Sequence, residues 1–194
     1  NDSLRDRNID VVIVVDGLAD VGEPPHSYLD CACRAAAGIA LAFLQSRDRV
    51  GVIRYAGAVD WAVPRGGRNQ LYAILDRLAR VRTIQSYVSP NMRLIPRSVL
   101  PPGSLVLVIT PLLDDRSIHM LTALAARGCR PIVLYVSPMG PVTAARPTDD
   151  AAALAERWWR LKHRGKIAHL RSMGLMVAEW DGVGSLDACL SSHF

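Results

Sequence analysis

The sequence predicts one α/β domain with a doubly wound, mostly parallel sheet, helices on both faces and one short antiparallel edge strand. Three observations predict this fold. Short β-branched runs alternate with helical patterns along almost the whole chain. Several of these runs are apolar on both faces, as the central strands of a parallel sheet are. The chain has 194 residues, half of them apolar, so a single domain over 1–194 can bury a core of its own.

The first half of the chain is expected to hold three strands and two helices. The apolar run over 9–15 ends at Asp16 and suits a central strand. Residues 58–63 alternate between apolar and polar, which suits a hairpin partner at the sheet edge. In order, the predicted elements are a strand over 9–15, a helix over 27–45, strands over 49–55 and 58–63, and a helix over 69–80.

The helix over 27–45 is expected to begin at an N-cap, Ser27, and to bury one apolar stripe. The residues of this stripe recur at helical spacing: Leu29, Cys33, Ala36, Ala37, Ala40, Leu41 and Leu44. Cys33 is therefore interpreted as a packing residue. The four cysteines have no zinc-ligand spacing, and free thiols in a core would fit a reducing cytosol.

The second half continues the alternation. Gly128 suits the left-handed position after a helix over 116–126. Thr148, followed by two aspartates, suits the N-cap of a long helix, and Ser185 is expected to cap a short closing helix. In order, the predicted elements are a weaker helical segment over 88–99, a strand over 104–109, a helix over 116–126, a strand over 130–136, a helix over 148–174 and a strand over 175–179.

Ligands of an open parallel sheet bind beyond the carboxyl ends of its strands, near the place where the strand order reverses. The segments expected there are 16–20, 66–69 and 110–115. No phosphate-binding fingerprint follows the first strand, because 16–20 reads Asp-Gly-Leu-Ala-Asp, so a nucleotide-dependent enzyme is not expected. The histidines are scattered and no nucleophile elbow is present, so no catalytic triad is predicted.

Three motifs carry a family resemblance: DRVGVIRYAG at 48–57, GGRNQLYAILDRL at 66–78 and GLMVAEWD at 174–181. With the apolar strand that ends in Asp16, they resemble the bacterial domain-of-unknown-function family numbered 58, which has a von Willebrand factor A-like, Rossmann-like fold. The likeness covers nearly the whole chain. It implies a non-enzymatic protein-protein interaction module, with a MoxR-type AAA+ ATPase as the partner for which this protein would be an adaptor or co-chaperone.

The broader fold is implied to bind Mg²⁺ through an Asp-x-Ser-x-Ser loop, a threonine in the Gly-Gly turn and an aspartate after a later strand. Asp16 matches the first position, but Leu18 and Asp20 stand at the two serine positions. Arg68 falls near the threonine and Pro111 near the second aspartate. Leucine and proline offer no side-chain oxygen. The resemblance therefore implies a degenerate metal-ion-dependent adhesion site with no cofactor, in which Arg68 could neutralise Asp16.

Two interpretations of the acidic residues stay open. In one, Asp16, Asp20, Asp114 and Asp115 gather at one end of the sheet and rebuild a Mg²⁺ site that could support hydrolase or nuclease chemistry. In the other, Asp20, Asp114 and Asp115 cap turns and helix starts. The leading prediction is a binding module that docks on a protein through the loops at 16–20 and 110–115.

The predicted long helix is the second candidate surface. Trp158 and Arg160 lie there among further basic residues, and tryptophan and arginine often anchor protein interfaces. A basic amphipathic helix can also lie on an anionic membrane, so peripheral membrane contact is a third possibility. A solvated basic face is the simplest interpretation.

Charge and targeting signals narrow the partners. The net charge of +5 suits an acidic partner, but the arginines are spread along the chain and no aromatic-plus-basic module is present, so nucleic acid is not expected. No signal peptide or apolar run of membrane-spanning length is visible, so a cytoplasmic location is expected. Because the chain begins abruptly at Asn1, we expect it to be part of a longer protein, whose membrane anchor could lie upstream.

Overall fold

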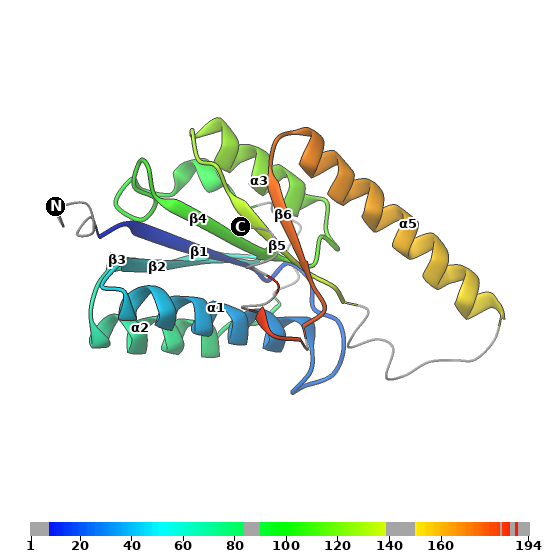
Figure 1. Ribbon diagram of the computed structural model, residues 1–194, viewed down its shortest axis with the longest axis horizontal. Helices are drawn as coiled ribbons and strands as arrows, with labels where there is room; N and C mark the ends of the chain where they lie inside the picture. The colour runs from blue at the N-terminus through cyan, green and yellow to red at the C-terminus, as the bar shows by residue number, and fades with distance from the viewer. Residues whose placement is uncertain (1–7, 84–89, 139–149, 183, 187–188, 190–194) are drawn as a thin grey trace, which may run out of the picture.

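The structure, a computed structural model, describes residues 8–83, 90–138, 150–182, 184–186 and 189. Its centre is a six-stranded sheet of order β3-β2-β1-β4-β5-β6 (Figure 1). Every neighbouring pair is parallel except β2 and β3, which are antiparallel. The strands are β1 (Asp10–Asp16), β2 (Arg49–Tyr55), β3 (Val59–Arg65), β4 (Leu105–Thr110), β5 (Ile132–Val136) and β6 (Met176–Trp180).

Helices cover both faces of the sheet, as Figure 1 shows. On one face, α1 (Tyr28–Gln45) and α2 (Arg68–Ala79) pack on the odd-numbered β1 residues, Val11, Ile13 and Val15. On the other, α3 (Arg116–Ala126) and the second half of α5 (Asp150–Ser172) pack with Val12 and Val14. Since alternate residues of β1 enter two separate cores, the continuous apolar run is explained. The predicted doubly wound fold class is confirmed.

The helical segment predicted over 88–99 is wrong in its described part. Between 90 and 99 the helical structure is a single short 3-10 turn, η1 (Met92–Leu94). Pro96 lacks an amide hydrogen and restricts the residue before it, so a continuous helix cannot pass through this position. Met92, Ile95 and Val99 belong to this non-helical segment and are buried in the core that also contains Val12 and Val14. Thr148 and most of the predicted closing helix after Ser185 lie outside the described residues.

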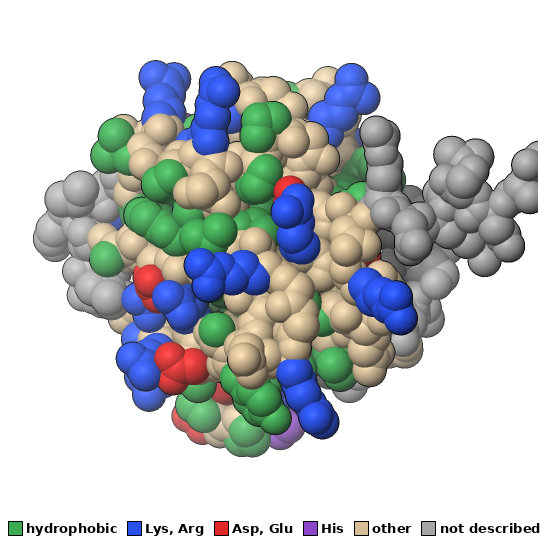
Figure 2. Space-filling model, turned by 90° about the vertical axis from the view of Figure 1, so that its left-hand side faces the viewer, with side chains coloured by type: hydrophobic (Ala, Val, Ile, Leu, Met, Phe, Trp, Pro, Cys, Tyr) green, Lys and Arg blue, Asp and Glu red, His purple; other side chains and the backbone are tan. Residues whose placement is uncertain are grey.

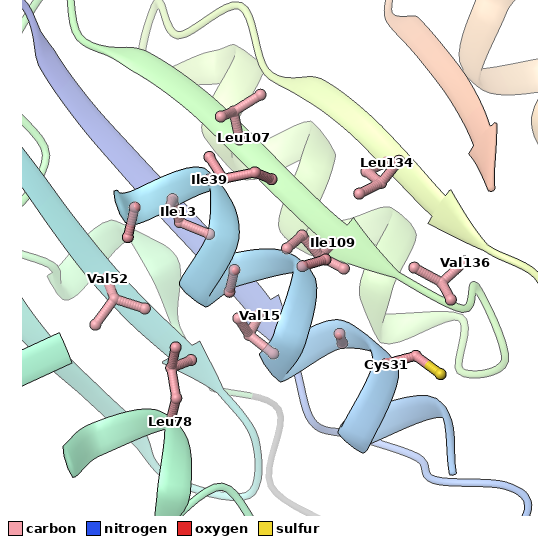
Figure 3. Close-up of a cluster of buried hydrophobic side chains, with 14 of the residues drawn as sticks. Ile13, Val15, Cys31, Ile39, Val52, Leu78, Leu107, Ile109, Leu134 and Val136 are labelled. Atoms are coloured by element: carbon pink, nitrogen blue, oxygen red, sulfur yellow. The ribbon is translucent and has the colours of Figure 1, made fainter. Parts of the chain in front are cut away.

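The start of α1 confirms the predicted N-cap. The Ser27 hydroxyl accepts from the amide of Asp30, and the Asp30 carboxylate accepts from the amide of Ser27, which forms a capping box. The predicted stripe is displaced around the helix, because Leu41 is 42% exposed and Cys31 rather than Cys33 is buried. The buried residues are Tyr28, Leu29, Cys31, Ala32, Ala35, Ala36, Ile39 and Ala40. Figure 3 shows Cys31 and Ile39 on the helix side of this core.

Tyr28 explains the displacement. Its side chain is completely buried, and its hydroxyl hydrogen-bonds to main-chain oxygens of the sheet, so residue 28 must face the strands. Cys33 then lies at the flank of α1, half-buried, where its thiol donates to the Leu78 carbonyl oxygen at 3.6 Å. Burial raises the pKa of Cys33 to about 11. This thiol therefore packs between α1 and α2 and is weakly nucleophilic at neutral pH.

Candidate functional site

The order of the strands reverses between β1 and β4. The chain adds β2 and β3 on one side of β1, then crosses over to add β4, β5 and β6 on the other. Asp16 and Thr110 end these two neighbouring strands. They therefore stand where doubly wound sheets bind their ligands, at what we call the carboxyl end of the sheet.

Asp16 is buried and its carboxylate oxygens accept hydrogen bonds from the protein itself. Its side chain is only 1% exposed. Oδ1 accepts from the amide of Leu18 at 3.1 Å. Oδ2 accepts from the hydroxyls of Thr110 at 2.6 Å and of Ser117 at 2.5 Å. Burial raises the pKa of Asp16 despite these hydrogen bonds, which act in the opposite direction.

A second set of bonds joins the same strands through the main chain. The Tyr28 hydroxyl lies between the carbonyl oxygens of Asp16, at 2.8 Å, and Ile109, at 3.1 Å. The Thr110 hydroxyl, which donates to Asp16, also accepts from the amide of Leu112 at 3.1 Å. Together these contacts connect the ends of β1 and β4 with the first turns of α1 and α3.

The 16–20 loop has a buried centre and an exposed rim. Leu18, which stands at a serine position of the resemblance, is buried at 6% exposure. Asp20 is exposed, and its Oδ1 accepts from the amides of Val21 and Leu29, each at 3.0 Å. Leu29 lies in the first turn of α1, where a carboxylate is favoured by the helix dipole. Asp20 therefore has the helix-capping role of the simpler interpretation.

The 110–115 loop is held by two cations. Asp114 accepts from the Arg116 guanidinium, the closest contact being 2.6 Å, and this pair lowers the pKa of Asp114. Asp115 pairs with Lys166 of α5 at 2.8 Å, which lowers the pKa of Asp115. The same Lys166 ammonium donates to the Leu112 carbonyl oxygen at 3.0 Å. The carboxylates of this loop therefore have basic partners of their own.

These residues do not fit the rebuilt cation site that the sequence left open. A divalent cation needs several oxygen ligands that converge on one point. Here Asp16 accepts from three protein donors, and Asp20, Asp114 and Asp115 have separate partners. Within the described ranges, no group of three or more His, Cys, Asp or Glu side chains could hold a metal ion. Asp20 and Asp114 accept from main-chain amides, as the capping interpretation expects, whereas Asp115 makes no side-chain capping hydrogen bond and pairs with Lys166.

Arg68 lies at the opposite end of the sheet from Asp16, so its predicted placement is wrong. Because β3 is antiparallel, its last residue, Arg65, pairs with Val50 near the start of β2, whereas Asp16 pairs with Tyr55 at the end of that strand. The turn at 66–67 and the exposed Arg68 follow directly. Figure 2 faces this amino end and shows basic side chains spread over it. Arg68 therefore cannot neutralise Asp16.

The segment that does return to the carboxyl end is 80–83, which the sequence interpretation missed. The Arg54 guanidinium donates to the Arg80 carbonyl oxygen at 2.8 Å, near the end of β2. A Cβ added to Gly17 would lie 3.5 Å from Val81 Cγ1. Thr83 follows two residues later and is exposed. The sequence could have indicated this placement, because the strand over 58–63 was expected to be antiparallel. A helix that follows such a strand begins at the amino end of the sheet and ends at the carboxyl end.

Trp158 and Arg160 lie on the first half of α5, away from Asp16, and point to different sides of the helix. Trp158 is 62% exposed, and Arg160 pairs with Glu156 at 2.5 Å within the helix. Figure 1 shows this half of α5 extending beyond the sheet. The predicted site residues thus divide among three places: the carboxyl end, the amino end and α5.

Comparisons with known proteins show partial structural likeness. No family model matches the chain, and no curated protein matches it. The conserved hypothetical protein BatB from Bacteroides thetaiotaomicron is similar at 22% identity and a TM-score of 0.46, over 66% of this chain and 66% of that one. An aerotolerance-related membrane protein from Bacteroides fragilis, solved with multiple mutations to serines, is similar at 20% identity and a TM-score of 0.43, over 66% and 67%. This chain thus spans just under two thirds of BatB.

None of the helices in the described part of the chain is both long enough and apolar enough to cross a bilayer.

Proposed function

We propose that this chain is a non-enzymatic binding module whose protein partner docks on the carboxyl end of the sheet. The observation that carries this proposal is that the Asp16 carboxylate is buried and hydrogen-bonded within the protein. The carboxylate at the strand switch is buried and accepts from Leu18, Thr110 and Ser117, so it holds the fold and is withdrawn from chemistry. The exposed residues around Asp16 are the docking surface that we propose.

The exposed rim of this end supplies the proposed contacts. Asp20, Thr83 and Asp115 are exposed and come from three different loops. Leu113 and Asp114, which precede Asp115 in the 110–115 loop, are half-buried. Ordered loops on a rigid sheet are a common platform for recognition. We propose that the partner contacts the 16–20, 80–83 and 110–115 loops together.

A MoxR-type AAA+ ATPase is the partner we propose, on the strength of the sequence resemblance in 48–57, 66–78 and 174–181. The interface would be independent of a metal ion, because Leu18 and Pro111 replace oxygen-bearing ligands and both are buried. The free cysteines fit a reducing compartment, so we propose that the complex forms in the cytosol.

Binding of the immobilised chain to a purified MoxR-type ATPase tests the proposal. Asp115→Arg reverses an 83% exposed charge at the carboxyl end and should weaken binding at least tenfold. Arg68→Glu is the matched control, because it reverses an exposed charge at the amino end and should leave binding unchanged. A loss with Arg68→Glu and not with Asp115→Arg would contradict the proposed site. Thermal melts should show that both variants fold.

Metal dependence is tested on the chain alone, so that the nucleotide-bound Mg²⁺ of the ATPase does not interfere. The chain is stripped with chelator, dialysed and titrated with Mg²⁺ and Mn²⁺ by calorimetry. We expect no saturable heat and no rise in melting temperature, since binding to the folded state must raise it. Saturable binding that Asp16→Ala abolishes, in a variant that still gives a cooperative thermal melt, would contradict the metal-independent interface and favour the hydrolase alternative.

A further inference from the structure

The two halves of α5 differ in their packing. His163, Ile167 and Leu170, in the second half, are buried against the sheet. Among the side chains described between 150 and 162, none is buried. A helix of about a dozen residues is only marginally stable by itself in water. The first half of α5 therefore gains little from the core, and its surface residues are free to serve contacts outside the domain.

An exposed apolar stripe runs along this half of the helix. Leu154 is 67% exposed, Trp158 is 62% exposed and Leu161 is 70% exposed. Their spacing of four and three residues places them on one face. Leu161 precedes the buried His163 by two positions, about 200° around the helix, so the stripe faces away from the core. Three large apolar side chains are thus aligned on the outward surface.

Cations border this stripe on both sides. Arg157 and Arg164 lie along one flank, and Lys162 lies on the other, with its ammonium 5.3 Å from the Trp158 ring centroid. After Glu156, the rest of α5 contains no acidic residue. Glu156 is turned away from solvent, with its side chain 14% exposed and paired with Arg160. The outward residues of 157–164 are therefore apolar or cationic, and the carboxylate of Asp115, from the 110–115 loop, interacts electrostatically with Lys162 at one flank.

We propose that this face of α5 binds the surface of an anionic lipid membrane. A helix face with leucine and tryptophan along its middle and cations on both flanks suits a surface of anionic headgroups. Leu154, Trp158 and Leu161 enter the boundary between headgroups and acyl chains, and the flanking arginines and lysine meet lipid phosphates. This inference concerns a different surface from the proposed protein-docking loops and does not depend on them.

Sedimentation with lipid vesicles at low salt tests this inference. The chain should bind vesicles of phosphatidylglycerol and phosphatidylcholine at least tenfold more tightly than vesicles of phosphatidylcholine alone, and added salt should weaken binding. Two variants remove the proposed contacts: Arg157→Glu with Arg164→Glu, and Leu154→Ser with Leu161→Ser. Each should reduce binding to the anionic vesicles at least tenfold.

Matched controls separate a specific face from general charge attraction. Arg93→Glu with Arg97→Glu makes the same change in net charge at two exposed arginines elsewhere, and Tyr72→Ser removes an equally exposed aromatic residue from α2. Both should keep vesicle binding. An equal loss in the charge control, or no binding of the unaltered chain, would overturn the inference. The inference would also be overturned if the α5 variants no longer bound the ATPase but still bound vesicles.

Fluorescence provides a measurement that needs no destabilising substitution. Brominated phosphatidylglycerol should quench tryptophan emission of the unaltered chain, because Trp158 enters the boundary region. In Trp158→Phe, which keeps an apolar ring at this position, vesicle binding should persist and most of the quenching should disappear. Unchanged quenching in Trp158→Phe would show that another tryptophan contacts the lipid and would overturn the assigned face.

Discussion

The Ser117 hydroxyl donates to the Asp16 carboxylate at 2.5 Å across a separation of 101 positions in the sequence. Both side chains are buried, Asp16 at the end of β1 and Ser117 in the first turn of α3. Thr110 joins the same carboxylate from the end of β4. One acidic side chain thus fastens three elements that meet at the strand switch.

Asp16→Ala should destabilise the fold. The substitution leaves the Leu18 amide and the hydroxyls of Thr110 and Ser117 without their buried acceptor, and each unsatisfied group costs about 1–3 kcal/mol. We expect the free energy of unfolding in urea to fall by at least about 2 kcal/mol. Asp16→Asn keeps the shape of the side chain and one carbonyl acceptor, so it should lose less stability than Asp16→Ala. Equal losses in the two variants would show that the hydrogen bonds are not what matters.

The pH dependence of stability should differ between the unaltered chain and Asp16→Asn. The pKa of Asp16 is raised in the folded state, so its contribution is fully present below the ordinary value of 3.8 and is lost as pH rises through the raised pKa. The free energy of unfolding of Asp16→Asn should therefore rise relative to that of the unaltered chain as pH increases from 3.8 toward neutrality. Asp114 and Asp115, with lowered pKa values, act in the opposite sense but are present in both proteins. If the Asn variant instead lost stability relative to the unaltered chain as pH rose, the raised pKa of Asp16 would be contradicted.

Tyr28→Phe should cost about 1–2 kcal/mol of stability, because the hydroxyl that lies between the Asp16 and Ile109 carbonyl oxygens is removed while the ring still fills its place. Tyr72→Phe is the control, since Tyr72 is 62% exposed and its variant should unfold as the unaltered chain does. Denaturant midpoints compared at equal slope provide the measurement. If Tyr28→Phe were neutral, the hydroxyl would have no net role in joining the strands.

Gly51→Ala should weaken the attachment of β3. A Cβ at this position would lie 2.8 Å from the Ala62 carbonyl oxygen and 2.9 Å from the Pro64 ring, at a register shift between β2 and β3. Backbone and proline cannot move away cheaply, so we expect a loss of about 1–3 kcal/mol. Gly38→Ala, inside α1 and with nothing within 4 Å of the added Cβ, should instead gain about 0.5–1 kcal/mol. Thermal melts of the two variants should shift in opposite directions.

The fold could be predicted largely because its signals are local. The strand over 9–15 is a single apolar run, and the Ser27 cap lies three residues from its Asp30 partner. The buried face of α1 could not be placed as well, since Tyr28 orients it through carbonyl oxygens of two distant strands. The segment over 90–99 kept a helical pattern of apolar residues although Pro96 interrupts the backbone.

The candidate site was harder to predict than the fold. Asp16 follows from its place at the end of an apolar strand, but Thr110 and Ser117 are ordinary hydroxyl residues whose role depends on distant pairing. Arg68 was misplaced because the interpretation followed the Gly-Gly motif of the resemblance and not the direction of the antiparallel edge strand, which the alternation over 58–63 already indicated. Once β3 is known to be antiparallel, the turn before α2 and the segment after it exchange ends of the sheet.

The antiparallel direction of β3 also determines where the protein can be immobilised without covering its proposed docking surface. The turn that precedes α2 lies at the end of the sheet away from Asp16, and Arg68 there is exposed. The pKa values of the native thiols, Cys31, Cys33, Cys129 and Cys189, are all raised, so a cysteine introduced by Arg68→Cys should react first with a thiol-specific reagent. A tether attached at this position would present the carboxyl end to solution in a single orientation, which makes an antiparallel strand a practical handle for surface-based binding assays.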